Sequence, residues 1–352
     1  MVLGVLKKGL FCKELGLDWD QFHPDDAADL DSLFGLPHQQ EQAQVWVVPV
    51  PFEATTSFGK GTAQAPQRIL EASWQVDLFD WETGHPWKAG LFLLPEEENI
   101  RVMNQKACAA LANQKEPWPA ELLETVNGMG DEVERHVYEQ TRNTLAAQKI
   151  PAIIGGDHSV PLGAIRAASE HYESFGILHV DAHADLREAY QGFTHSHASI
   201  FHNVLNRCDV QKLVQVGIRD LGEAEYNRAV EDRRIHLHSD LAIQDALARG
   251  QNFADVCHRI LQPLPQNVWI SFDVDGLDPS LCPNTGTPVP GGLQFREALT
   301  LLAALGQSGR KIVGFDLVEV GDHPWDANVG ARLLYKMAGW AIKTNKIAEE
   351  RT

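Results

Sequence analysis

Three short apolar runs in this chain each end in a cluster of acidic and histidine side chains. The clusters read GGDHS at 155–159, VDAHADLR at 180–187 and SFDVDGLDP at 271–279. The runs before them, at 151–154, 176–180 and 268–272, are short and β-branched or aromatic, which is typical of buried parallel strands. Open α/β sheets build their sites at the carboxyl ends of such strands, so the sequence predicts one site assembled from three strand ends.

The spacing inside the clusters favours a metal site. Asp181, His183 and Asp185 alternate along the chain, and Asp273 and Asp275 repeat the alternation. Each set would share one face if the strand geometry continued. Carboxylates at this density repel one another unless cations lie between them, and a bound pair of metals removes the conflict.

A single Asp-x-His or Asp-x-Asp fragment is ordinarily a turn, a helix cap or a solvated strand edge. Three such clusters on successive strand ends are much harder to obtain by accident, and together they favour two divalent metals. The ligand set is rich in oxygen and has no thiolate, which favours Mn²⁺, with Ni²⁺ as the main alternative and Co²⁺, Fe²⁺ and Zn²⁺ also open, over a closed structural zinc site. The six candidate ligands are His158, Asp181, His183, Asp185, Asp273 and Asp275.

Short apolar runs alternate with helical patterns from Val45 onward. Further strands are predicted at 213–217 and 311–315, and helices near 66–72, 132–138, 161–168, 240–261, 294–306 and 326–343. This alternation predicts an α/β fold, a three-layer αβα sandwich with a mainly parallel central sheet. Residues 94–134 form the least regular part, for which a loop, an oligomer contact and a lid over the site all remain open.

Around these motifs the chain resembles the ureohydrolases, the family of arginase, agmatinase, guanidinobutyrase, formimidoylglutamase and guanidine hydrolase. The resemblance runs from about Val45 to about Ile342. It includes the three metal motifs in family order, TTSFGKGT at 55–62, GTPVPGG at 286–292 and GFDLVEV at 314–320. It implies an arginase-like fold and a hydrolase acting on a C–N bond of a linear amidine, and it is more specific for the family than for the substrate.

The resemblance also implies how the ligands divide. One metal would be bound by His158, Asp181, Asp185 and Asp273, and the other by Asp181, His183, Asp273 and Asp275. Asp181 and Asp273 would bridge the two ions. A hydroxide held between them would attack the guanidinium carbon and release urea and an amine.

A proton donor for the leaving amine is implied as well. The segment SHAS at 196–199 is similar to the family segment that holds a shuttle histidine, which indicates His197. His195 and His202 are neighbouring alternatives. Asp185 is assigned to the catalytic set as well as to the metal ligands.

Two more residues are assigned by resemblance. Glu319 ends the run KIVGFDLV and is similar to the family glutamate that pairs with the guanidinium, so it is assigned to catalysis and to substrate binding. An ordinary charged strand end is the alternative. Thr287 is similar to a residue that contacts the reacting end of the substrate, with a plain turn role as the alternative.

Two positions differ from arginase. Arg187 stands where arginases carry an asparagine that helps to read the α-carboxylate, and Gly222 stands where they carry an aspartate facing the α-amino group. The segment DLRE at 185–188 instead resembles agmatinase. We therefore assign Arg187 to the substrate pocket and rank agmatine first, then guanidine, guanidinobutyrate or another guanidino acid, and then arginine and formimidoylglutamate.

Two other classes of protein compete with this interpretation. A noncatalytic metal-binding subunit is one, but the chain keeps all six ligands together with His197 and Glu319. A phosphatase or amidase using the same metals is the other, but no glycine loop that would cradle phosphate and no arginine cluster accompanies the motifs.

Length and charge agree with a single enzyme domain. The chain has 352 residues and 44% hydrophobic content, which suits a catalytic domain at 45–345 with an extension at 1–44 and a tail at 346–352. The net charge of −18 argues against nucleic-acid binding and suits a small cationic guanidino substrate. The family resemblance implies a homo-oligomer, a trimer or hexamer.

The cysteines and the amino terminus bear on location. The five cysteines are widely spaced and form no CxxC pair, which indicates reduced thiols in a cytoplasmic protein. Residues 1–12 have no sustained hydrophobic core followed by a cleavage site, and no run approaches membrane-spanning length. We therefore expect neither a signal peptide nor a membrane partner.

Overall fold

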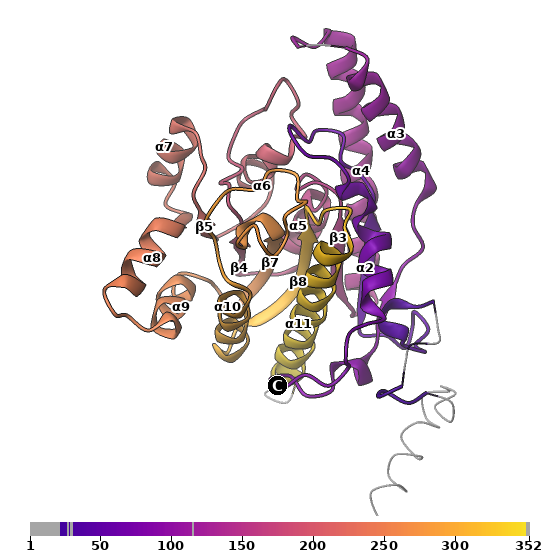
Figure 1. The fold of residues 1–352 in the computed structure, drawn as a ribbon, viewed down its shortest axis with the longest axis vertical. Coiled ribbons are helices and arrows are strands. Elements are labelled where there is room, and N and C mark those ends of the chain that lie inside the picture. Colours follow the sequence, from indigo (N-terminus) through magenta and orange to yellow (C-terminus); the bar gives the residue numbers. More distant parts are fainter. Residues whose placement is uncertain (1–21, 27, 29–30, 115, 350–352) are drawn as a thin grey trace, which may run out of the picture.

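An eight-stranded parallel sheet lies at the centre of the computed structural model, which describes residues 22–26, 28, 31–114 and 116–349 (Figure 1). The strands are β1 (Val45–Val50), β2 (Leu91–Leu93), β3 (Ile150–Gly155), β4 (Phe175–Val180), β5 (Lys212–Ile218), β6 (Ile235–Ser239), β7 (Asn267–Asp273) and β8 (Lys311–Val318). Their order is β2-β1-β3-β8-β7-β4-β5-β6, and every pairing is parallel. The predicted parallel sheet is confirmed.

The central strands are buried on both faces, because helices cover both. All six residues of β4 are buried, as expected for a continuous apolar run in a parallel sheet. Side chains alternate between two hydrophobic clusters, so that Ile270 and Phe272 of β7 pack on one side and Trp269 on the other. The three-layer sandwich follows from this alternation.

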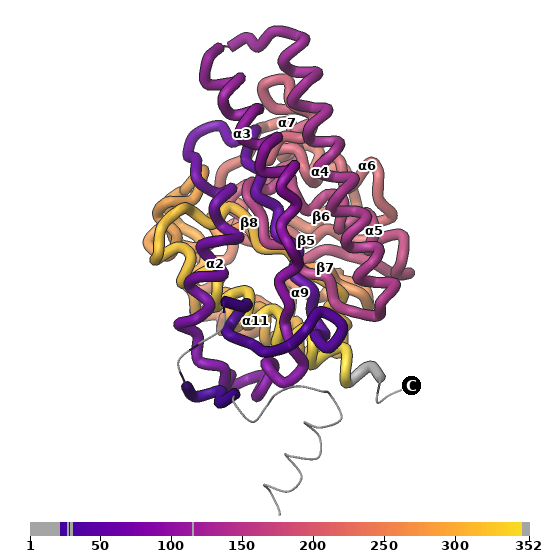
Figure 2. Tube along the Cα trace, turned by 90° about the vertical axis from the view of Figure 1, so that its right-hand side faces the viewer, coloured from indigo at the N-terminus to yellow at the C-terminus, as the bar shows by residue number. Residues whose placement is uncertain are grey.

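The helices divide between these two clusters (Figures 1 and 2). One face is covered by α2 (Ala65–Ser73), α8 (Asp240–Ala248), α9 (Phe253–Leu261), α10 (Phe295–Gln307) and α11 (Pro324–Glu349). The other is covered by α3 (Glu98–Ala112), α4 (Ala120–Ala146), α5 (Leu162–His171) and α6 (Ile200–Arg207), with α7 (Glu223–Glu231) beside β6. Short 3-10 turns lie at Leu33–Gly35, Thr62–Gln64, Pro86–Ala89, His197–Ser199 and Val274–Gly276.

The interpretation of 94–134 as irregular is wrong. Most of this segment belongs to α3 and α4, and two of its prolines, Pro117 and Pro119, lie in the connection between these helices. The helix expected at 240–261 is two helices, because Gly250 adopts a φ of 81° and Asn252 caps α9. The edge strands β2 and β6 were not expected, and neither were α6 and α7.

The hairpin of α3 and α4 projects beyond the rest of the molecule (Figures 1 and 2). It also supports the segment before His197. The Asn127 side chain of α4 donates to the Gly192 carbonyl at 3.3 Å and accepts from the Thr194 N–H at 2.9 Å. The hairpin therefore holds the loop that leads into the site.

The amino-terminal region is only partly described. Residues 1–21, 27 and 29–30 of the proposed extension lie outside the described residues, as does 350–352 of the proposed tail, so the expectation of no signal peptide has no structural counterpart here. Leu33, Phe34 and Leu36, which precede β1, are buried in the main core.

None of the helices in the described part of the chain combines the length and apolar character that a membrane crossing requires.

A buried histidine in this region makes the stability of the fold depend on pH. His38 is 5% exposed, and burial lowers its pKa from 6.5 to about 4 against a backbone hydrogen bond to Lys88 that raises it. As the pH falls from 6.5 to 4, the unfolded chain takes up a proton that the folded chain does not, so the free energy of unfolding should fall by about 3 kcal/mol from this group.

Urea unfolding of the wild type and of His38→Gln at both ends of this pH range, with chelator present, measures the contribution. We expect the wild type to lose more stability than the variant on acidification. An identical pH dependence of the two proteins would contradict the assignment.

Candidate metal centre

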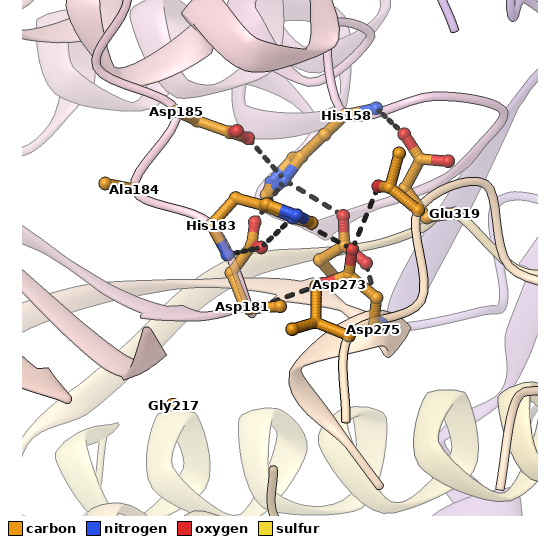
Figure 3. Close-up of polar contacts among 12 residues, drawn as sticks. His158, Asp181, His183, Ala184, Asp185, Gly217, Asp273, Asp275 and Glu319 are labelled. Carbon is orange, nitrogen blue, oxygen red and sulfur yellow. Dashed lines mark hydrogen bonds and ion pairs between the residues drawn. The ribbon is translucent and has the colours of Figure 1, made fainter. Parts of the chain in front are cut away.

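Four neighbouring strands deliver the predicted ligands to one place. β3 leads to His158, β4 to the DAHAD segment at 181–185, β7 to Asp273 and Asp275, and β8 to Glu319. Because β3, β8, β7 and β4 are adjacent and parallel, their carboxyl ends meet at one edge of the sheet. Figure 3 shows these side chains pointing toward one another.

The backbone does not keep the strand geometry through the ligand segments, which was the condition for the ligands to share one face. β4 ends at Val180, and Asp185 adopts a left-handed φ of 53°. Asp275 lies in the 3-10 turn Val274–Gly276, where its N–H donates to Asp273 Oδ1 at 2.8 Å. Glu319 has a φ of 61°. Non-glycine residues in this region are strained by about 1–3 kcal/mol, and such strain is concentrated at functional sites.

His158 directs one ring nitrogen into the acidic cluster. Its Nδ1 lies 2.9 Å from Asp181 Oδ2, 3.1 Å from Asp185 Oδ2 and 3.3 Å from Asp273 Oδ2. Its Nε2 lies 3.0 Å from Ser271 Oγ, which itself donates to Asp316 Oδ1 at 2.8 Å. Since the serine proton is used by Asp316, Nε2 must donate to the serine, which leaves Nδ1 as the atom that faces the carboxylates.

His183 faces a second pair of carboxylates, those of Asp275 and Asp181. Its Nδ1 lies 3.1 Å from Asp275 Oδ2 and 3.4 Å from Asp181 Oδ1. Asp181 thus presents one oxygen to each histidine, which is the geometry that a bridging ligand needs. Asp273 approaches His158 with Oδ2, while its Oδ1 accepts the Asp275 N–H.

The carboxylates in this cluster are deeply buried. Burial raises the pKa of Asp185 to about 7, with the negative charge of Asp181 adding to the rise, and burial followed by Asp275 raises that of Asp273. Within the described residues, no lysine or arginine pairs with these carboxyl groups. Carboxylates and imidazoles without a cationic partner fit divalent cations, so the donor set suits the metals that the sequence predicted.

The sequence interpretation missed the residues behind the ligands. His179 lies two residues before Asp181 on β4, and its Nε2 is 2.8 Å from Asp181 Oδ2. Ser271 also lies two residues before a candidate ligand, Asp273, but its hydroxyl contacts His158 and Asp316. The alternation that we used to find the ligands, followed backward into each strand, points to both residues.

Of the three candidate proton donors, His197 lines the cavity in front of the cluster. Its Nδ1 lies 3.8 Å from Glu319 Oε1 and its Nε2 lies 3.4 Å from Ser57 Oγ. Burial lowers its pKa to about 4. His195 instead contacts Asp131 of α4 at 2.9 Å, and His202 contacts Asn206 and Arg228.

Of the two carboxylate oxygens of Glu319, one accepts a hydrogen bond from a described residue and the other does not. Oε1 accepts the His158 N–H at 3.0 Å, whereas Oε2 is buried and has no hydrogen-bond partner among the described residues. Burial, followed by the charge of Asp273, raises the pKa of Glu319 well above its usual range. Buried polar groups are normally bonded, so Oε2 is a position for a donor that the protein itself does not supply.

The same cavity extends outward over polar residues and has a volume of about 340 Å³. Thr287 lies near its inner end, with Oγ1 3.3 Å from Asp275 Oδ2. At the outer end, Arg187 lies over the Tyr190 ring at 4.9 Å and its Nε is 3.3 Å from Glu225 Oε2. A Cβ atom at Gly222 would lie 3.7 Å from Arg187 Nη2, so the two positions that differ from arginase are neighbours.

Comparison with known proteins agrees with this geometry. The sequence profile of the Arginase family matches residues 43–339. An N(1)-aminopropylagmatine ureohydrolase of Thermus thermophilus is 36% identical over 281 residues, which cover 80% of this chain and 83% of that protein. An agmatinase of Proteus mirabilis is 33% identical over 278 residues, covering 78% of this chain and 79% of that protein.

A solved structure gives the same result for the fold. The agmatine ureohydrolase of Thermoplasma volcanium superimposes with a TM-score of 0.69 over 90% of this chain and 96% of that chain, at 24% identity. The likeness in sequence spans most of the chain and includes the strands and loops that carry the acidic cluster. The chain therefore belongs to the arginase family.

Proposed function

We propose that this ureohydrolase acts on a guanidino compound whose far end carries a positive charge, with agmatine as the first candidate, and releases urea and an amine. The observation that carries the proposal is the buried Glu319 Oε2, which has no donor among the described residues. The Glu319 carboxylate adjoins the cavity wall, since its Oε1 lies 3.8 Å from Nδ1 of His197, a residue that lines the cavity. A guanidinium supplies charged N–H donors of the kind that this oxygen lacks. The relatives named above are ureohydrolases of agmatine and of a substituted agmatine, which agrees with it.

Membership of the arginase family implies a binuclear divalent metal centre. We propose that one ion is held by His158, Asp181, Asp185 and Asp273, and the other by Asp181, His183, Asp273 and Asp275. We favour Mn²⁺ over Ni²⁺ because oxygen donors outnumber nitrogen donors. When bound, the ions would lower the pKa of a water molecule in the site toward neutrality.

The remaining residues of the site orient the substrate and move a proton. Glu319 would hold the guanidinium through Oε2, and Thr287 would limit the position of the reacting end. His197 is neutral at pH 7 because of its lowered pKa, so it can accept a proton released from the attacking water. Its Nδ1, which lies on the Glu319 side, would then return that proton to the leaving amine.

The charges at the outer end of the cavity favour a cationic tail. Arg187 is already paired with Glu225, and that glutamate also accepts the N–H groups of Leu186 and Gly222. Among the described residues, the unpaired charge that remains on this part of the cavity wall is Asp220, which is exposed. A carboxylate tail would have to draw Arg187 away from Glu225, whereas an ammonium tail would meet Asp220 directly.

A guanidino acid such as guanidinobutyrate is the second candidate, because Arg187 also lines this end of the cavity and its side chain is 42% exposed. The relevant contrast is therefore the charge of the tail. A cationic tail could pair with Asp220. An anionic tail could pair only with Arg187, which already contacts Glu225.

Steady-state kinetics with agmatine, guanidinobutyrate, arginine and guanidine test this assignment. We expect agmatine to have the highest kcat/KM and arginine to be about 5- to 150-fold poorer, because its α-carboxylate would lack a free partner at a cost of about 1–3 kcal/mol. Asp220→Asn should lower kcat/KM for agmatine several-fold and leave guanidine, which has no tail, unchanged. The highest kcat/KM for arginine would contradict the assignment.

A further inference from the structure

Behind the bridging carboxylate lies a chain of buried polar groups that ends in a glutamine. His179 on β4 and Gln215 on β5 are paired in register, so their side chains lie next to each other on the same face of the sheet. Both are 0% exposed. His179 Nε2 lies 2.8 Å from Asp181 Oδ2, and its Nδ1 lies 3.0 Å from Gln215 Nε2.

The backbone at Ala184 determines which way the glutamine amide points. Gln215 Nε2 lies 2.7 Å from the Ala184 carbonyl oxygen, which can only accept a hydrogen bond. The opposite amide orientation would place two acceptor oxygens against each other in a buried site. The amide N–H₂ therefore faces both the Ala184 carbonyl and His179, even though Gln215 Oε1 has no partner among the described residues.

This orientation determines the tautomer of the histidine. Because Gln215 donates to Nδ1, that atom must accept, and the ring proton of neutral His179 must be on Nε2. Nε2–H then donates to Asp181 Oδ2, the oxygen that also faces His158 Nδ1 at 2.9 Å. The other hydrogen bond of Gln215 goes to the Ala184 carbonyl, between His183 and Asp185. One amide therefore holds both His179, which contacts Asp181, and the backbone of the loop that carries two more candidate ligands.

We infer that Gln215 is a positioning residue for the metal centre, which fixes the Nε2–H tautomer of His179 and thereby aims Asp181 at the two metal positions. The inference rests on the proposed role of Asp181 as a metal ligand. It adds His179 and Gln215 to the residues that form the proposed metal centre. Gln215 lies on β5, a strand that supplies no candidate ligand.

Two readouts test the inference in the full-length protein. In metal-free wild-type protein with ¹⁵N-labelled histidine, long-range ¹H–¹⁵N correlations should show His179 with its proton on Nε2. Titration with Mn²⁺ should show that Gln215→Leu raises the Kd by about 10–100-fold, the usual effect of losing a residue that orients a ligand. The isosteric Gln215→Glu, which cannot donate when ionised, should also raise the Kd and should place a proton on His179 Nδ1.

Gln266→Leu is the matched control, since Gln266 Nε2 also donates to one backbone carbonyl, that of Gly309 at 3.0 Å, but at the amino end of β7. It should bind Mn²⁺ with the wild-type Kd. The inference is overturned by an Nδ1–H tautomer in the wild type, or by a wild-type Kd in both Gln215 variants. If the wild type binds no Mn²⁺ at all, the proposed metal centre is wrong, which is a different result from an unchanged Kd.

Discussion

Replacing Asp181 with asparagine is expected to remove both metal ions and to lower kcat/KM by more than about 10³-fold. The reason is geometric, because Asp181 presents Oδ2 to His158 and Oδ1 to His183, so one side chain contributes to both groups. An asparagine offers one neutral oxygen and one N–H₂ group, which cannot serve as a second ligand. Asp273→Asn is expected to have a similar effect.

Metal content after dialysis against Mn²⁺, measured with kcat/KM on the best substrate, checks this result. Asp255→Asn is the control, since Asp255 is an exposed carboxylate on α9. Two ions per chain and wild-type kinetics in Asp181→Asn would show that Asp181 is not a bridging ligand.

Removal of the metals supplies an independent signature. With chelator present, Asp273→Asn should be more stable to urea than the wild type, because the variant avoids burying or protonating one of several adjacent carboxylates. With Mn²⁺ present the order should reverse, because ligand binding stabilises the wild type. A wild type that is more stable than the variant in chelator would show that the cluster is not repulsive without metal.

Replacing His197 with alanine should lower turnover by about 10–10⁴-fold while both metals stay bound. His197 lines the cavity and lies 3.8 Å from Glu319, but within the described residues it forms no hydrogen bond or ion pair with the four aspartates of the cluster. Added imidazole should restore part of the lost activity, because it can carry the same proton. His202→Ala, a substitution of a nearby histidine that faces Asn206 and Arg228, should leave turnover near the wild-type value.

Metal analysis of His197→Ala separates the two roles that a histidine in this place could have. Loss of one ion would make His197 a ligand and not a proton carrier. Unchanged turnover would leave proton transfer to another group or to water.

The ligands could be predicted from the sequence because local rules and the fold agree at these strands. An apolar run followed by Asp181 or Asp273 has few alternatives to a buried strand with an acidic end, and parallel strands bring such ends together. Of the hairpin of α3 and α4, only the helix near 132–138 within α4 could be predicted in this way. Its helices carry mixed polar faces and acidic and proline-containing ends, and they are held by tertiary packing that a local pattern does not contain.

The finer geometry of the site was also beyond the sequence. The left-handed backbone at Asp185 and Glu319 is imposed by the surrounding structure, since only a few per cent of non-glycine residues adopt it, aspartate more often than glutamate. The partner of Arg187 is set by where α7 begins, because Glu225 lies in its first turn. Sequence could indicate that Arg187 differs from arginase, but not that its charge is already matched.

The strand order has a consequence for how the protein is made. β3 and β4 are consecutive strands in the chain, joined through α5, yet β8 and β7 lie between them in the sheet. With adjacent strands about 4.8 Å apart, this leaves two half-sheets separated by about 14 Å until the last two strands are inserted. During synthesis His158 and Asp181 leave the ribosome long before Asp273 and Glu319. A nascent chain that ends before Asn267 therefore carries His158 in one half-sheet and the three candidate ligands at 181–185 in the other. The proposed metal centre is complete only when β7 and β8 have been inserted between them.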